Sequence, residues 1–156
     1  MSLAIIVFIT WLFIILLSKI PKRLSEHDMI FLFFVNTIFE LSIFTLMHLN
    51  FNWIVVSHNV EKSIADLVMR LILNPLTFII TTNFLLYPRK FLKWILMGGM
   101  LLYFILMERL LEWLGVLTVH HWKPWLSILM FSSYAVFSRL MAWFITNVDR
   151  KEVKKV

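Results

Sequence analysis

Residues 63–87 read SIADLVMRLILNPLTFIITTNFLLY, and this stretch decides how the whole chain is threaded. It contains thirteen Leu, Ile, Val or Phe residues, each of which favours insertion into a bilayer by about 0.3 to 0.6 kcal/mol. Asp66 and Arg70 oppose insertion by about 2.5 to 3.5 kcal/mol each if they lie near the bilayer centre. Hydropathy alone therefore leaves this segment near balance.

The composition around this segment is that of a membrane protein. Of the 156 residues, 61% are hydrophobic, and the mean hydropathy is +0.86, well outside the range of soluble domains. Apolar segments cover roughly 2–18, 29–49, 63–87, 91–114 and 124–146, each long enough for a helix to cross about 30 Å of hydrocarbon. We predict an all-α transmembrane helical bundle of about five spans, with residues 1–156 forming one membrane domain and no soluble catalytic domain.

Basic residues set the orientation that we expect. Ten lie on one side of the predicted threading and two on the other, and cytoplasmic connections carry the excess of Lys and Arg. The N-terminus is therefore predicted outside and the C-terminus inside. If residues 63–87 did not span, three basic residues after them would be stranded outside, so the charge bias also favours insertion of this segment. The ten are Lys19, Lys22, Arg23, Arg89, Lys90, Lys93, Arg150, Lys151, Lys154 and Lys155, and the two are Lys62 and Lys123.

The net charge of +6 points to lipid as the partner and not to nucleic acid. The basic residues cluster beside hydrophobic segments, where they attract anionic headgroups. The chain has no cysteine, which excludes disulfides, thiolate metal sites and a nucleophilic cysteine. We expect a multi-pass protein of a bacterial cytoplasmic membrane, in contact with the lipid bilayer and with a membrane-protein partner or further copies of itself.

Charged side chains inside the predicted spans are the most informative feature for function. Such residues normally face a bundle interior, pair with one another or line a pathway. Asp66, Arg70 and Asn74 are spaced four residues apart, so they share one helical face, and Asp66 and Arg70 are predicted to pair. Pro75 is predicted to kink the same helix, because it lacks an N–H and clashes with the carbonyl of Leu71. The charged residues within spans are Glu40, Asp66, Arg70, Glu108, Arg109, Glu112 and Arg139.

Glu40 has no basic residue in its own predicted helix. It requires Arg70, another cation or a bound proton. On the fourth span Glu108 and Glu112 are one turn apart, and Arg109 can approach Glu112. Whether these groups only hold helices together or form a substrate or proton site stays open. The predicted polar cluster comprises Glu40, Asp66, Arg70, Asn74, Glu108 and Glu112.

A metal-dependent site is less well supported by the sequence. Carboxylates and His48, together with the loop residues His58, His120 and His121, would lie in the outer half of the bundle. These are ligand types that Zn²⁺ accepts, but no HExxH motif is present. We expect no bound metal, no cofactor and no catalytic residue, and neither a phosphate-binding glycine loop nor a serine elbow occurs.

Small residues mark sites suited to close helix packing. Gly98 and Gly99 lie together on the fourth span, and Ser132 and Ala135 share a face of the fifth with Arg139. Arg139 itself is expected to extend toward the inner headgroups.

Several residues taken together resemble a known family. Asp66 stands nine positions before Pro75, Tyr87-Pro88 closes the third span, and Glu108 stands seven before Gly115, followed by Trp122 and Ser127. This order is similar to an uncharacterised family of small, roughly five-span membrane proteins of endospore-forming bacteria.

The resemblance covers about residues 27–140. Family members usually have Glu where this chain has Asp66, and a Glu-Trp pair in the fourth span, which here occurs at Glu112-Trp113. The resemblance implies a bacterial membrane location and no particular activity.

Three functions are compatible with these features. The first is a non-enzymatic structural or partner-binding membrane subunit, indicated by the lack of any catalytic motif. The alternative is a small oligomeric permease or a proton or ion pathway that uses the intramembrane carboxylates. A metal-dependent membrane enzyme is the third.

Overall fold

The computed structural model describes residues 1–51, 53–88, 90–119 and 123–153. Within these ranges five helices are long and apolar enough to cross a membrane, which confirms the predicted all-α bundle and its number of spans. The predictions made for Arg89, His120, His121, Trp122, Lys154 and Lys155 fall outside the described residues.

The five spans are built from six α-helices and two π-helical turns. They are α1 (Ser2–Lys19), α2 (Glu26–Thr45) continued by η1 (Leu46–Asn50), α3 (Val60–Val68) continued by η2 (Met69–Leu73) and α4 (Asn74–Leu85), α5 (Lys90–Trp113) and α6 (Pro124–Val153). The last helix continues seven residues beyond the span predicted to end at 146, into the charged tail.

Local signals explain where two of these helices begin and end. Ser25 precedes α2 and forms a reciprocal capping box with Asp28, so both backbone donors at the helix start are satisfied. Gly115 follows α5 with a φ of +62°, and the N–H of Val116 donates to the Leu111 carbonyl at 2.9 Å. This is the Schellman ending, which needs a left-handed residue and therefore favours glycine.

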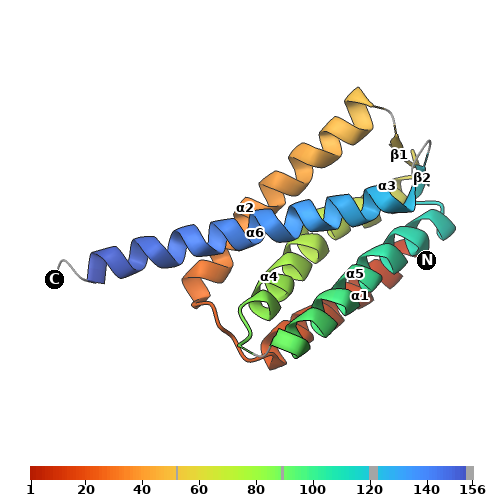
Figure 1. The fold of residues 1–156 in the computed structure, drawn as a ribbon. Coiled ribbons are helices and arrows are strands. Elements are labelled where there is room, and N and C mark those ends of the chain that lie inside the picture. The colour runs from red at the N-terminus through yellow and green to blue at the C-terminus, as the bar shows by residue number, and fades with distance from the viewer. Residues whose placement is uncertain (52, 89, 120–122, 154–156) are drawn as a thin grey trace.

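The third span lies at the centre of the bundle. Seventy-two per cent of its most apolar window is buried, whereas the corresponding share in the other four spans is at most 28%. Its α4 segment packs against α1, α2, α5 and α6, which lie around it in Figure 1. The segment whose insertion was least certain by hydropathy is thus the one that the other helices cover.

Buried polar side chains follow the central helix along most of its length. In a bilayer these groups must find partners inside the protein. The hydroxyls of Thr77 and Thr81 donate to the carbonyls four residues earlier at 2.8 and 2.7 Å, and Asn83 does the same at 3.0 Å. The central helix therefore satisfies part of its polar content by itself.

A π-helical turn stands where the proline was expected to disturb the helix. The Asn74 N–H donates to the carbonyl of Met69, five residues earlier, immediately before Pro75. The π-helical turn therefore changes the backbone hydrogen-bond pattern just before Pro75, which has no N–H to donate. Such π turns are a recognised cause of helix bending. The bend predicted at Pro75 itself stays a prediction.

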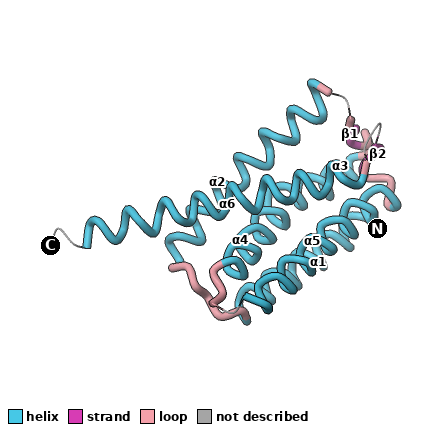
Figure 2. Tube along the Cα trace, viewed as in Figure 1, coloured by secondary structure: helices cyan, strands magenta, loops and turns pink. Residues whose placement is uncertain are grey.

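Two short strands join connections that were expected to be loops. β1 (Ile54–Val56) pairs antiparallel with β2 (Leu117–Val119), with Ile54 opposite Val119. The pair links the connection after α2 to the connection after α5, at the end of the bundle where the N-terminus lies (Figure 2). Ile54 of β1 and Leu117 of β2 belong to the same buried apolar cluster as residues of the helices.

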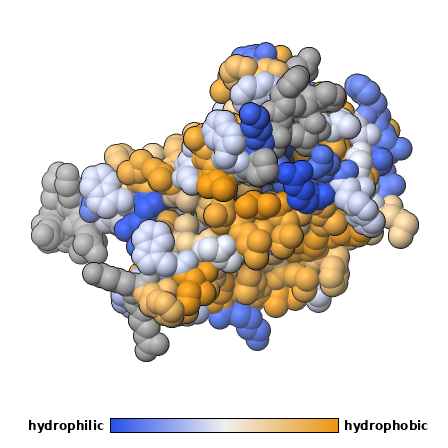
Figure 3. Space-filling model, turned by 45° about the vertical axis from the view of Figure 1, so that its right-hand side comes forward, coloured by the Kyte–Doolittle hydropathy of each residue, from blue (hydrophilic) through white to orange (hydrophobic). Residues whose placement is uncertain are grey.

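Apolar side chains face outward over much of the surface. They cover the middle of the face shown in Figure 3, and hydrophilic side chains gather mainly around that area. Large exposed side chains include Phe34, Ile38, Trp94 and Val136. Such a surface suits lipid and not water, which agrees with a multi-pass membrane protein.

The start of α1 and the last turns of α6 lie at opposite ends of the bundle, as an odd number of spans requires (Figure 1). Which end faces the cytoplasm stays a prediction, and the absence of cysteine makes it directly testable. Single cysteines introduced as His58→Cys, before α3, and His27→Cys, at the start of α2, lie at opposite ends and replace exposed residues.

We expect a maleimide that cannot cross membranes to label His58→Cys in intact cells, because that end is predicted to be outside. The His27→Cys thiol should react only after the cells are permeabilised. Labelling in the reverse order would show that the orientation derived from the basic residues is wrong.

Candidate functional site

Arg70 is the centre of a buried charge cluster. Its Nε donates to Asp66 Oδ2 at 2.8 Å, which confirms the pair predicted within the helix, and its Nη1 donates to Glu40 Oε1 at 3.2 Å. The guanidinium carbon also lies 3.3 Å from the ring centroid of Phe44. All three charged side chains are buried, so one cation is held by two carboxylates and the face of an aromatic ring.

Glu40 is the link between two spans. Its Oε1 accepts from Arg70 and also from the Asn74 Nδ2 at 2.8 Å, so of the three partners considered for it the structure supplies the cation Arg70. The buried hydroxyl of Tyr134, on α6, interacts with the same carboxylate. Glu40 is therefore fixed through Oε1 and has a phenol from a third span beside it.

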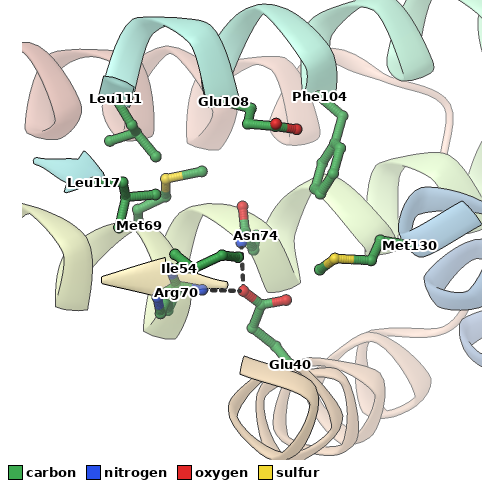
Figure 4. A pocket seen from close by; sticks show the side chains of 10 residues that line it. All are labelled: Glu40, Ile54, Met69, Arg70, Asn74, Phe104, Glu108, Leu111, Leu117 and Met130. Atoms are coloured by element: carbon green, nitrogen blue, oxygen red, sulfur yellow. Dashed lines mark hydrogen bonds and ion pairs between the residues drawn. The ribbon is translucent and has the colours of Figure 1, made fainter. Parts of the chain in front are cut away.

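A cavity lies beside this cluster, and Figure 4 shows the side chains around it. Its volume is about 50 Å³. Its polar lining comes from Glu40, Arg70, Asn74 and Glu108. Apolar side chains of α5, α6 and the two strands supply most of the remaining wall.

Glu108 faces the cavity from α5, on the wall opposite Glu40 in Figure 4. Its Oε1 is buried and lacks a hydrogen-bond partner within the described part of the chain. Carboxylates from two different helices thus line the same cavity. A buried carboxylate oxygen without a donor, as at Glu108, is energetically costly.

Glu112 lies apart from this cluster. It is exposed on α5 and pairs with Arg109 at 2.7 Å, the approach that the sequence indicated for these two residues. Of the six residues predicted as one group, the structure joins Glu40, Asp66, Arg70 and Asn74 by hydrogen bonds and places Glu108 across the cavity. Arg139 is half-buried on α6, and its expected extension toward the headgroups stays a prediction.

A second polar contact joins three spans at Asn36, one helical turn before Glu40 on α2. Asn36 Nδ2 donates to the Ser138 hydroxyl at 3.1 Å, and Ser138 lies 2.7 Å from the Thr82 hydroxyl. Sequence analysis named neither Ser138 nor Thr82, because isolated hydroxyl residues are common in membrane helices. Their positions on predicted spans, with Ser138 three residues after Ala135, were the available signal.

His48 is held at the edge of the site. Its Nδ1 lies 2.6 Å from the carbonyl oxygen of Ile54, so this nitrogen is the donor, and its ring stacks on Phe44 with centroids 5.3 Å apart. Phe44 therefore contacts both His48 and Arg70, while Ile54 contributes to the cavity wall. The histidine ties strand β1 to the helix that carries Glu40.

Metal ligation receives no support from these positions. Among the described residues there is no group of three or more His, Asp or Glu side chains that could hold a metal ion. The expectation that the protein works without metal or cofactor stays a prediction.

The fold and the site define the class of protein, a small multi-pass α-helical membrane protein with a polar interior. Comparison with protein-family models, curated proteins and solved structures finds no match for this chain. The resemblance to the five-span family of endospore-forming bacteria is therefore still a hypothesis.

Replacing Arg70 tests whether the buried cluster organises the bundle. Arg70→Met leaves two buried carboxylates without their cation, which should lower the free energy of unfolding by about 3–5 kcal/mol. Arg109→Met is the matched control, because its pair with Glu112 is half-exposed and such pairs contribute at most about 1 kcal/mol. Unfolding in mixed detergent micelles measures both.

Neutralising the carboxylates should reverse part of the loss. Adding Glu40→Gln and Asp66→Asn to Arg70→Met removes the uncompensated charges, so stability is expected to recover toward that of the parent protein. Equal destabilisation by Arg70→Met and Arg109→Met would show that the cluster does not organise the fold.

Proposed function

We propose that this protein is a small ion or solute permease of the bacterial cytoplasmic membrane that takes up a cation or proton in its intramembrane cavity. The observation that carries the proposal is that carboxylates from two different helices, Glu40 and Glu108, line one cavity, and that the buried Glu108 Oε1 has no hydrogen-bond partner among the described residues. Intramembrane carboxylates of this kind characterise ion and proton pathways.

The charges around the cavity favour a cationic occupant. Glu40, Asp66 and Glu108 carry three formal negative charges against the single positive charge of Arg70, which leaves two negative charges when all are ionised. Inside an apolar bundle this excess is expensive. A proton or small cation bound near Glu40 and Glu108 would reduce it.

Polar side chains beyond the cavity support a route through the bundle. The Asn36, Ser138 and Thr82 contact lies next along α2 and α4, and Asn83 follows, where its Oδ1 accepts from the Arg23 backbone N–H at 2.9 Å. Buried polar groups thus continue from the cavity toward the connection between α1 and α2. A cation or proton crossing the bundle would meet a polar partner at each level.

Flux measurements test this function. In proteoliposomes the protein should dissipate an imposed cation or pH gradient, and Glu108→Gln should slow it by at least about tenfold, because the cavity loses one of its two acceptor carboxylates. Glu112→Gln, the same change one turn away on the exposed face of α5, should leave the rate unchanged. Equal rates for Glu108→Gln and the parent protein would contradict the proposal.

A partner-binding subunit is the second candidate, favoured by one observation on α5. Gly98 and Gly99 are exposed, and within the described chain nothing lies within 4 Å of where a β-carbon would stand on either. A membrane-helix surface made of glycines lets another helix approach closely, because no side chain stands in the way. It would also serve an oligomeric permease.

Association through this surface predicts a simple result. Gly98→Leu should abolish recovery of a stoichiometric partner or second copy after mild solubilisation and cross-linking, because the added side chain keeps the helices apart. Ile38→Phe, an exposed change on α2, is the control that adds bulk to the outer surface on a different span from the glycines. Recovery unchanged by Gly98→Leu would remove this candidate.

A further inference from the structure

We infer that the occupant of the cavity is a short primary ammonium ion, with a charged –NH₃⁺ group and one or two carbons. This inference rests on the proposed function, because it names the class of cation that the same site takes. It follows from the acceptors, the size and the walls of the cavity.

The acceptors suit an ammonium head. Glu40 is 1% exposed, and its Oε1 is held by Arg70 and Asn74, so its orientation is set before a ligand arrives. The Oε1 of Glu108, on the wall opposite Glu40 in Figure 4, is buried and has no donor among the residues that the structure describes. An –NH₃⁺ group has three donors and no acceptor, so it would supply the donor that Glu108 lacks, and the charge of Glu40 would attract it.

The size of the cavity limits the ligand. Its volume is about 50 Å³. One water needs about 10–15 Å³, so the space takes about three to five atoms of this size. Methylammonium and ethylammonium fit this limit, whereas a quaternary ammonium with several ethyl groups does not.

The walls favour a cation with an apolar part. Phe104 and Met130 line the cavity together with aliphatic side chains, and an aromatic face also attracts cations. A metal ion such as Ca²⁺ that gives up its water would need six to eight oxygen ligands, which these apolar walls do not provide. A bare proton would need no cavity of this size.

Arg70 does not prevent the binding of a cation. Its guanidinium is neutralised by Asp66 at 2.8 Å and by Glu40 at 3.2 Å, and it stacks on Phe44. The cluster keeps an excess of negative charge with Arg70 in place. A monovalent ammonium would therefore lower the net charge of the site without displacing an existing ion pair.

Calorimetric titration of the purified full chain with ethylammonium chloride, at constant ionic strength made up with NaCl, tests the inference. Saturable binding is expected, and Glu108→Gln should weaken it by at least about tenfold, whereas Glu112→Gln should not change it. Tetraethylammonium has the same charge but exceeds the cavity, so it should not bind. Binding of Na⁺ that competes at equal concentration would overturn the assignment to ammonium ions.

A second variant guards against loss of fold in Glu108→Gln. Met130→Phe narrows the cavity from α6 without altering any charge, and it should abolish ethylammonium binding while the thermal unfolding transition is retained. Binding that persists unchanged in both variants would place the ligand elsewhere and overturn the inference.

The outcome separates this inference from the proposed function. Gradient dissipation by protons or metal cations without ethylammonium binding would overturn the ligand class and leave the permease intact. Saturable ethylammonium binding without flux of any cation would support the site and overturn transport.

Discussion

The burial of the Arg70 guanidinium inside an apolar bundle is the constraint on which the rest of the structure depends. A charge removed from water must be paired at short range, because the low dielectric of the interior penalises an isolated ion. Asp66 supplies one carboxylate from the same helix and Glu40 the other from α2. Pairing with Glu40 fixes how α2 lies against the central span, and Asn74 and Phe44 reinforce the same register.

A polar interior and an apolar exterior follow from this arrangement. The central span carries the groups that would cost most in lipid, and the four outer spans cover it with apolar faces turned outward. Most buried polar atoms of the described residues find partners within the bundle. Among the exceptions, Glu108 Oε1 belongs to a residue of α5 that lines the cavity, where an occupant would supply the missing donor.

Particular residues show how far sequence reasoning reached. Asp66 and Arg70 could be paired in advance because four-residue spacing on a helix brings them together whatever the tertiary fold. The Glu40 contact could only be offered as one of three alternatives, since its partner lies thirty residues away in the chain. Glu112 resembles Glu108 in sequence, but its helix turns it to the surface and toward Arg109. The strands β1 and β2 escaped notice because each is three residues long and gains its backbone pairing only from the other.

The sequence by itself determined the class of the protein, the number of spans and the pair within one helix. Hydrophobic length, basic flanks and helical spacing act locally and need no knowledge of neighbours. Only the tertiary structure decided that the most polar span is central, that Glu40 meets Arg70, and that Glu40 and Glu108 line one cavity while Glu112 does not. These outcomes depend on which helix faces which, and that choice is made by packing and by the cost of unpaired charge across separate segments.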